Sequence, residues 1–339
     1  MDHTNIEWTD ATWNPIRGCS RVSAGCENCY AERVAARFSG PGMPYEGLAT
    51  MGESGPRWTR QVALVRSKLD VPLRWRKPRR IFVNSMSDLF HEGLADEQIA
   101  AVFGIMAAAP QHTFQVLTKR AERMYKWFVW ACSRMATPTA LMQQNAADAL
   151  AGDLVGEERD ALLQRSGILK TSPVTTPWPL PNVWLGVSAE DQGSAIARIP
   201  HLLKTPASIR FVSYEPALGP VSFMRYLRAT AMPGRCIDID GDWWHKPGSC
   251  GYCLPRLDWV IAGAENGPGA RPMREDWVRT VRDDCARTGV SFFYKQRIDE
   301  DSGSGSRKVA LPVLDGRQHV EWPTPPPVKK LDDLEETQP

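Results

Sequence analysis

Three cysteines lie close together near the start of the chain, in residues 18–30. Cys19, Cys26 and Cys29 are separated by six and then by two residues, and a glycine precedes each of the first two. Glycine lets the backbone approach closely and offer N–H groups to sulfur. Three thiolates without a neighbouring fourth suit a metal centre that keeps one coordination position open. The pattern predicts an iron–sulfur cluster with one iron not bound by cysteine, or a zinc site completed by a distant residue such as His91.

A second cysteine group lies in residues 236–253. Cys250 and Cys253 form a knuckle-type pair, and Cys236 and His245 supply a third and a fourth candidate ligand. These four residue types suit a closed zinc site, while an auxiliary iron–sulfur cluster and no metal at all are the alternatives. The two remaining cysteines, Cys132 and Cys285, stand alone in helical patterns and are interpreted as buried free thiols. In a reducing compartment, grouped cysteines indicate metal binding or catalysis rather than disulfides.

Short apolar runs recur along the chain, each followed by polar residues and then by a helical pattern. They occupy residues 81–83, 113–117, 183–187, 209–212, 259–261 and 291–294, and residues 11–16 supply a first strand. Short runs rich in Val, Ile and aromatic residues are typical of buried parallel strands. Amphipathic stretches such as residues 96–109 provide the crossover helices. The order predicts an α/β fold: a partial or complete TIM-like (βα) barrel of about six to seven parallel strands.

Polar side chains cluster just after these runs. In a barrel, the residues at the carboxyl ends of the strands form the site. The candidates are Ser85, Ser87, Asp88, Lys119, Ser188, Glu190, Ser213, Glu215, Glu265 and Lys295. Helix capping accounts for some of the serines and aspartates, but less well for the glutamates and lysines. We therefore expect these side chains to line one cavity beside the three cysteines.

The chain is expected to form one barrel domain over residues 1–311. Three insertions interrupt the alternation of strands and helices, at residues 39–80, 121–180 and 226–257. The second has a mostly helical pattern, and the third carries the second cysteine group. Residues 312–339 are rich in proline and then acidic, a composition that predicts a disordered tail.

Composition excludes several classes of protein. The 339 residues include 42% hydrophobic and 24% charged residues, which is ordinary globular composition and excludes wholesale disorder. A net charge of +2 is too even for a nucleic-acid coat protein. The lack of a long apolar run and the polar N-terminus predict no membrane span and no signal peptide, hence a cytoplasmic protein. The basic stretch at residues 74–80 suits either a nucleic-acid patch or a solvated face.

The loop at residues 18–30 resembles the cluster-binding loop of the radical S-adenosylmethionine (SAM) superfamily. More closely, the chain resembles the phage-associated three-cysteine-motif protein family, which is related to that superfamily. The matching stretches are residues 8–15, 19–31, 82–91, 112–120, 184–190, 211–220, 259–273 and 292–296. The cysteine spacing of six and two differs from the usual three and two of the superfamily. Residues 84–88 also stand where the superfamily usually has a Gly-Gly-Glu-like motif for the SAM amine.

The resemblance implies a radical-SAM-like barrel with a [4Fe–4S] cluster on Cys19, Cys26 and Cys29. The fourth iron would bind the amino and carboxylate groups of SAM. One electron from an electron donor would cleave the sulfonium and give a 5′-deoxyadenosyl radical, which abstracts a hydrogen from the substrate. The protein's part in such chemistry is to position the reacting groups and to exclude water.

The chemistry of SAM suggests a division of labour among the strand-end residues. Ser85 and Asp88 are assigned to its methionine end, Lys119 to its carboxylate, and Ser188 with Glu190 to its ribose. Ser87 and Ser213 are further cofactor-binding candidates. Glu215, Glu265 and Lys295 lie farther round the barrel and are the candidate catalytic residues. A structural ion pair between Lys119 and a glutamate is the alternative.

Two hypotheses about function follow from the residues together with the resemblance. The first is a radical-SAM-like iron–sulfur enzyme that acts on a nucleic acid or a nucleotide, in repair or modification. The second is a zinc-stabilised barrel of phage origin that binds nucleic acid or a protein partner and has no redox activity.

Overall fold

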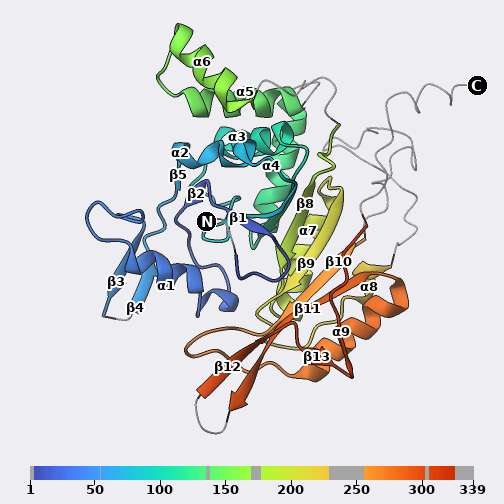
Figure 1. Cartoon of the computed structure of the whole chain (residues 1–339). Helices are drawn as coiled ribbons and strands as arrows, with labels where there is room; N and C mark the ends of the chain where they lie inside the picture. The colour runs from blue at the N-terminus through green and yellow to red at the C-terminus, as the bar shows by residue number, and fades with distance from the viewer. Residues whose placement is uncertain are drawn as a thin grey trace, which may run out of the picture.

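A curled eight-stranded sheet is the centre of the computed structural model, which describes residues 4–53, 55–134, 138–168, 177–228, 256–301 and 305–324. Seven neighbouring strands are parallel and the last is antiparallel. In spatial order they are β1 (Ala11–Trp13), β6 (Arg80–Val83), β7 (Thr113–Thr118), β8 (Val183–Ser188), β9 (Ile209–Tyr214), β10 (Trp259–Gly263), β11 (Ser291–Asp301) and β12 (Gly305–Ala310). Figure 1 shows the sheet curling from β1 to β12 as part of a barrel.

The α/β class and a partial barrel are therefore confirmed. The seven parallel strands coincide with the seven predicted runs, but the first strand ends at Trp13 rather than at residue 16. The eighth strand, β12, was not predicted; it returns antiparallel to β11. Within the described residues the sheet stays open, since β1 and β12 are its two edges.

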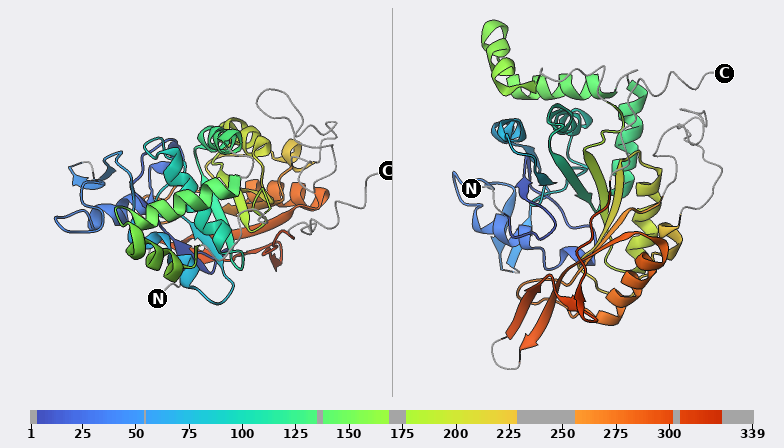
Figure 2. Two further views of the ribbon diagram at one scale, coloured as in Figure 1. Left: turned by 90° about the horizontal axis from the view of Figure 1, so that it is seen from above. Right: turned by 45° about the vertical axis from the view of Figure 1, so that its right-hand side comes forward.

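The helices explain why the strand sequences are apolar throughout. They are α1 (Tyr30–Arg37), α2 (Arg66–Leu69), α3 (Asp96–Ala108), α4 (Ala121–Arg134), α5 (Pro138–Ala151), α6 (Gly156–Ser166), α7 (Gln192–Lys204), α8 (Met224–Leu227) and α9 (Glu275–Thr288), with 3-10 turns η1 (Ala24–Cys26) and η2 (Val71–Arg74). Helices α7 and α9 lie on one side of the sheet, and α1 with the β3–β4 hairpin lies on the other (Figure 2). Strands β8, β9 and β10 are buried along their whole length, as expected for parallel strands covered on both faces.

Each of the two faces of the sheet has its own apolar cluster. The larger cluster joins the sheet to the helices, and its strand residues include Ile81, Val83 and Val116. The smaller one is aromatic and joins Trp8 to alternate strand residues such as Phe82, Phe211 and Trp259. This aromatic cluster fills part of the inside of the partial barrel.

The insertions have different structures. Residues 39–80 form the hairpin β3 (Ala49–Gly52) and β4 (Gly55–Trp58), and also β5 (Ala63–Leu64), which pairs with β2 (Ile16–Arg17). Residues 121–180 are mostly helical, as predicted, and supply α4 to α6. Helix α5 covers the outer side of α3, so α3 is buried nearly all round instead of on one face. Gly104 allows this close approach, because a Cβ there would lie 2.1 Å from the Met142 carbonyl oxygen.

The folded domain extends beyond residue 311, the predicted boundary. Strands β13 (Val313–Leu314) and β14 (Arg317–Gln318) form a short hairpin, and Trp322 packs on Trp259 with ring centroids 5.0 Å apart. The predicted tail therefore begins no earlier than residue 325, and residues 325–339 lie outside the described residues.

Two further observations concern the predictions about membrane spans and about the two isolated cysteines. No helix in the described ranges is both long and apolar enough to span a membrane. Cys132 and Cys285 are free thiols, and Cys285 is buried.

Candidate active site

The cysteine loop, residues 18–30, leaves the end of β2 and covers the carboxyl ends of the strands. Gly18 pairs with Ser87 in a parallel bridge. Its φ is +86°, and a Cβ there would lie 2.1 Å from the Gln61 carbonyl oxygen, so only glycine fits this backbone position. The loop then forms η1 and enters α1, with Cys29 as the N-cap residue. All three cysteines are thus placed by one short segment between two fixed ends.

A cavity of about 700 Å³ lies between this loop and the strand ends. Cys19, Cys26 and Cys29 all line it. The predicted residues that line it are Ser85, Ser87, Asp88, Lys119, Ser188, Ser213, Glu215, Glu265 and Lys295. Glu190 does not line the cavity, but its carboxylate contacts the cysteine loop at Ser23. The structure therefore brings the predicted strand-end residues and the three cysteines together at the mouth of the partial barrel, where the rule for parallel barrels places a site.

Asp88 and Arg120 hold the beginning of the cysteine loop. The Asp88 carboxylate accepts hydrogen bonds from the Thr118 hydroxyl at 2.7 Å and from the Arg120 guanidinium at 3.1 Å. Arg120 also donates to the carbonyl and the hydroxyl of Ser20, at 3.1 and 2.7 Å. Its Nη1 lies 4.0 Å from the sulfur of Cys19. Because both charged side chains are buried, this pair fixes the position of Cys19 relative to β7.

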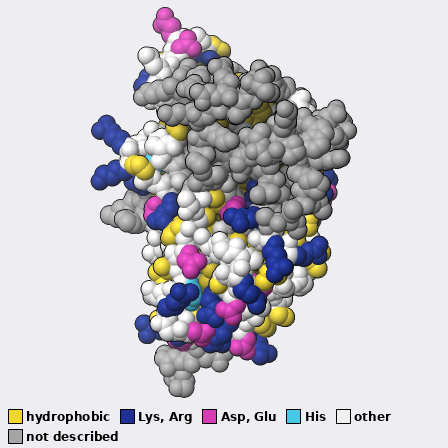
Figure 3. Space-filling view, turned by 90° about the vertical axis from the view of Figure 1, so that its right-hand side faces the viewer, with side chains coloured by type: hydrophobic (Ala, Val, Ile, Leu, Met, Phe, Trp, Pro, Cys, Tyr) yellow, Lys and Arg dark blue, Asp and Glu magenta, His cyan; other side chains and the backbone are white. Residues whose placement is uncertain are grey.

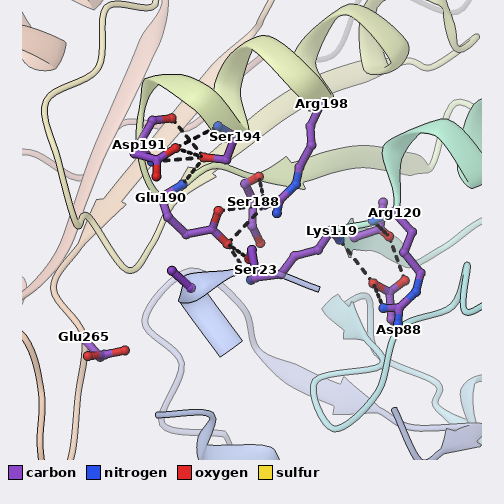
Figure 4. Close-up of polar contacts among 12 residues, drawn as sticks. Ser23, Asp88, Lys119, Arg120, Ser188, Glu190, Asp191, Ser194, Arg198 and Glu265 are labelled. Carbon is purple, nitrogen blue, oxygen red and sulfur yellow. Dashed lines mark hydrogen bonds and ion pairs between the residues drawn. The ribbon is translucent and has the colours of Figure 1, made fainter. Parts of the chain in front are cut away.

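Glu190 holds the middle of the loop (Figure 4). It accepts hydrogen bonds from the Ser23 hydroxyl at 2.9 Å and from Arg198 at 2.9 and 3.1 Å, and Lys119 Nζ lies 3.6 Å away. Burial disfavours the carboxylate, but Lys119 and Arg198 outweigh it and hold the pKa of Glu190 below its ordinary value. A Cβ on Gly25 would lie 2.4 Å from Glu190 Oε1. The loop backbone therefore rests directly on this buried carboxylate.

Glu265 and Arg271 hold the end of the loop. Asn28 donates to Glu265 at 2.9 Å, and Arg271 donates to both carboxylate oxygens, at 2.9 and 2.6 Å. Arg271 reaches the loop as well, through the Ala24 carbonyl at 2.8 Å and the Glu27 carboxylate at 2.9 Å. Burial raises the pKa of Glu265, but the hydrogen bonds from Arg271 and Asn28 outweigh this and lower it. Residues next to Cys26 and Cys29 are thus tied to the end of β10.

These contacts occupy three carboxylates that the sequence suggested for cofactor binding or catalysis. The carboxylate oxygens of Asp88, Glu190 and Glu265 mostly accept hydrogen bonds from other groups of the protein. The Lys119–Glu190 contact matches the alternative of a structural ion pair. The roles of these residues in binding a cofactor or a substrate stay predictions. Their contacts show that they help to position the cysteine loop.

Glu215 and Lys295 differ, because they bind each other and not the cysteine loop. Lys295 Nζ lies 2.5 Å from Glu215 Oε1, and Gln296 donates to the same oxygen at 3.3 Å. All three side chains line the cavity. This pair therefore presents an acid and a base to the cavity from β11 and the end of β9.

The three thiols are free and partly exposed to the cavity. Burial, together with the carboxylate of Asp88, raises the pKa of Cys19 to about 12, and the Arg120 guanidinium opposes this shift. Burial also raises the pKa of Cys29, although backbone N–H groups at the start of α1 lower it. Such thiols are protonated at neutral pH unless a metal replaces the proton.

His91, a predicted zinc ligand, lies beside the cysteine loop. Among the residues that the structure describes, no group of three or more His, Cys, Asp or Glu side chains is arranged to hold a single metal ion. The His91 Nδ1 accepts from the Gly93 N–H at 3.0 Å, and its Nε2 lies 2.9 Å from the Ser20 hydroxyl. The iron–sulfur cluster and the zinc site both stay predictions.

The second predicted metal site cannot be placed. Cys236, His245, Cys250 and Cys253 lie outside the described residues.

The floor of the cavity carries two buried donors that sequence reasoning missed. Trp8, Phe82 and Leu117 supply apolar surface, and Asn84 lies beside them in the lining. Within the described ranges, neither Trp8 Nε1 nor Asn84 Nδ2 has a hydrogen-bond partner. Asn84 has a φ of +60°, a left-handed conformation that asparagine tolerates better than most residues. Unpaired buried donors call for a partner, and a ligand with acceptor atoms would supply one.

Two arginines were missed as well. Arg120 directly follows the predicted Lys119, so its place after a strand was a usable signal. Arg271 lies in a loop after β10, and nothing in its local sequence distinguishes it from other exposed arginines. The complete site offers thiols, hydroxyls, an acid–base pair and an apolar floor, which suits a ligand with one charged end and one flat apolar part.

Comparison with known proteins gives one match. The profile of a family described as "Protein of unknown function (DUF5131)" matches residues 3–323, nearly the whole chain. No curated protein and no solved structure matches the chain.

Proposed function

Since the chain belongs to the DUF5131 family, whose function is not established, we propose its activity from the chemistry of the cavity. The proposal is an iron–sulfur enzyme of the radical SAM type, with a [4Fe–4S] cluster on Cys19, Cys26 and Cys29. The observation that carries it is the opening of these three thiols on one cavity at the carboxyl ends of parallel strands. A cluster held by three cysteines keeps one iron for a further ligand.

The donor set fits this group. Three thiols are present, they are free, and both ring nitrogens of the nearby His91 already have hydrogen-bond partners in the protein. Arg120 near Cys19 and Lys119 near Cys29 each oppose the rise in thiol pKa that burial causes, as cations beside thiolates do. When bound, the cluster and SAM supply a one-electron reduction, with the electron taken from an external donor, that breaks the sulfonium carbon–sulfur bond and releases methionine.

The chain's own residues would bind and orient the cofactor and the substrate, and they would exclude water from the cavity. The serine hydroxyls that line the cavity suit a ribose or a carboxylate, and the apolar floor suits a flat base. The buried donors Trp8 Nε1 and Asn84 Nδ2 would gain acceptors from such a ligand. Glu215 and Lys295 stand in the cavity away from the cysteine loop, where they would hold or exchange a proton with the substrate.

The test is anaerobic purification, followed by iron and sulfide analysis and a visible spectrum. We expect about four iron atoms per chain and a brown protein. Cys19→Ala, Cys26→Ala and Cys29→Ala should each lose the iron and the colour. Cys132→Ala is the matched control, because it removes a free thiol elsewhere in the fold and should keep both. With dithionite and SAM, the parent should release methionine. A colourless parent with stoichiometric zinc at these cysteines would refute the proposal and favour a zinc-stabilised binding protein.

A further inference from the structure

One exposed side of α1 combines aromatic and basic side chains beside the cavity. Tyr30, Arg33, Val34, Arg37 and Phe38 recur at helical spacing and share one side of the helix, here called the α1 face. The opposite side packs inward through alanines, against Tyr45 and Trp58. Tyr30, Val34 and Phe38 are 40–50% exposed. Three large apolar side chains that are so exposed on one side of a helix form an unusual surface patch. The face is therefore not part of the core.

The α1 face begins at the mouth of the cavity. Tyr30 and Arg33 line the cavity, and so does Trp58 of the neighbouring hairpin. Tyr30 also donates a hydrogen bond to the Ser85 carbonyl at the end of β6. A ligand that lies along α1 would thus enter the cavity without leaving the protein surface.

The surroundings of the α1 face carry uncompensated positive charge. Residues 17–60 contain six arginines and four glutamates. Glu27 and Glu32 are already paired, with Arg271 and Arg21. Five arginines form no ion pair with any residue that the structure describes: Arg17, Arg33, Arg37, Arg57 and Arg60. This excess favours an anionic ligand.

Other basic regions lack this combination. On the face that includes α9, basic and acidic side chains intermingle (Figure 3), and Arg279 and Arg282 both bind Asp315. The basic stretch at residues 74–80 precedes β6, at the opposite end of the strands from the cavity. There Arg74 pairs with Asp70, and Arg80 pairs with Asp10. The stretch suggested by the sequence is therefore a poorer candidate for substrate binding than the α1 face.

We propose that the α1 face binds a single strand of nucleic acid and leads one nucleotide into the cavity. Aromatic side chains interleaved with arginines suit bases that stack and phosphates that carry charge. Residues four apart on α1 are separated by about 6 Å along the helix axis, a step that an extended single strand can follow. A duplex would first have to expose the nucleotide. This inference deepens the proposed function, because it names the substrate class of the same cavity and rests on that function for the chemistry.

The test uses fluorescence anisotropy with a labelled single-stranded DNA of about twelve nucleotides, and the RNA of the same sequence as a second probe. Phe38→Ala should raise Kd by about 5- to 100-fold, because it removes a stacking surface. Phe38→Leu keeps the apolar volume and should bind nearly as weakly, which separates stacking from a folding defect. Arg37→Glu should raise Kd by about tenfold and reduce the salt dependence. The matched control is Lys77→Glu, an exposed charge reversal at the other end of the strands, which should stay within about twofold.

Three results would overturn the inference. The first is parental affinity for both strands in the Phe38 and Arg37 variants. The second is an equal loss in the Lys77 variant. The third is displacement of the oligonucleotide by polyglutamate as readily as by unlabelled strand, which would identify an acidic polypeptide as the ligand. The iron content of the same samples separates the two proposals. Binding through α1 without iron would refute only the proposed function, and iron without such binding would refute only the α1 proposal.

Discussion

The contact between Gly25 and Glu190 offers a quantitative test of how the cysteine loop is held. Gly25 lies within η1, where alanine is an acceptable residue for the backbone. A Cβ there would nevertheless meet three atoms of the Glu190 side chain, at 2.4, 2.6 and 2.8 Å. Arg198 and Ser23 hold that side chain in place. We therefore expect Gly25→Ala to destabilise the fold by about 1–3 kcal/mol, the usual cost of overpacking.

The same contact predicts a specific coupling between two substitutions. Glu190→Ala should cost about 3–5 kcal/mol, because it leaves Arg198 buried without its carboxylate. It also removes the atoms that collide with the new methyl group. Gly25→Ala should then cost nothing further, so the double variant should be about 1–3 kcal/mol more stable than the sum of the single effects predicts.

Urea unfolding of the parent, both single variants and the double variant measures this coupling. Gly193→Ala is the matched control, since Gly193 lies near the start of α7 and its new Cβ would come no closer than 3.5 Å to its nearest neighbour. That variant should be neutral or slightly stabilised. Gly25→Ala with parental stability, or additive effects in the double variant, would refute the idea that the loop rests on Glu190.

Two further predictions concern the frame around the site. Gly186→Ala should lower stability by about 1–3 kcal/mol and lower the thermal midpoint, because its Cβ would lie 2.5 Å from the buried ring of Phe211; an unchanged midpoint would contradict this packing. Asp191→Ala should cost about 1 kcal/mol at pH 7, because the Asp191 carboxylate caps α7 through the Ser194 N–H at 2.7 Å. That bond lowers the Asp191 pKa below 3.8, so the contribution is present above about pH 4 and is lost as the pH falls through the folded-state pKa. Urea unfolding over a series of pH values from 7 downward checks this, and a cost that does not fall as the pH is lowered would contradict it.

The sheet could be predicted from sequence because its signal is local. Each strand is a short apolar run bounded by polar residues, and burial on both faces removes any alternation that would complicate the pattern. β12 was missed because only alternate positions in an antiparallel edge strand need be apolar, and residues 305–310 are mostly polar. The fold between residues 312 and 324 was missed for another reason. Its composition resembles that of a disordered tail, whereas Trp322 and the β13–β14 hairpin depend on partners far away in sequence.

The location of the site could be predicted, but not the partners of its residues. The carboxyl ends of parallel strands meet at one edge, so position along the chain was enough to gather the serines, lysines and carboxylates. Which carboxylate faces the cavity and which faces the cysteine loop depends on contacts across long sequence separations. Glu265 contacts Asn28, and Glu190 contacts Ser23. Arg271 lies within the matching stretch 259–273, but its residue type and local sequence do not predict that it reaches the cysteine loop.

The composition of the cysteine loop explains why it needs these contacts. Residues 18–30 contain few large apolar side chains, so hydrophobic burial cannot fix the loop on the barrel. Charge-assisted hydrogen bonds hold the loop instead, at Ser20, Ser23 and Asn28. Ser20 follows Cys19 and Asn28 precedes Cys29, whereas Ser23 lies three residues before Cys26.

The three anchors also come from different parts of the sheet. Arg120 follows β7, Glu190 follows β8 and Glu265 follows β10, so the relative positions of the sulfur atoms are set by the barrel and not by the loop alone. The six residues between Cys19 and Cys26 include both Ser20 and Ser23, the residues that two of the anchors hold. The six-residue spacing between Cys19 and Cys26 thus accommodates two of the residues through which the loop is attached to the barrel.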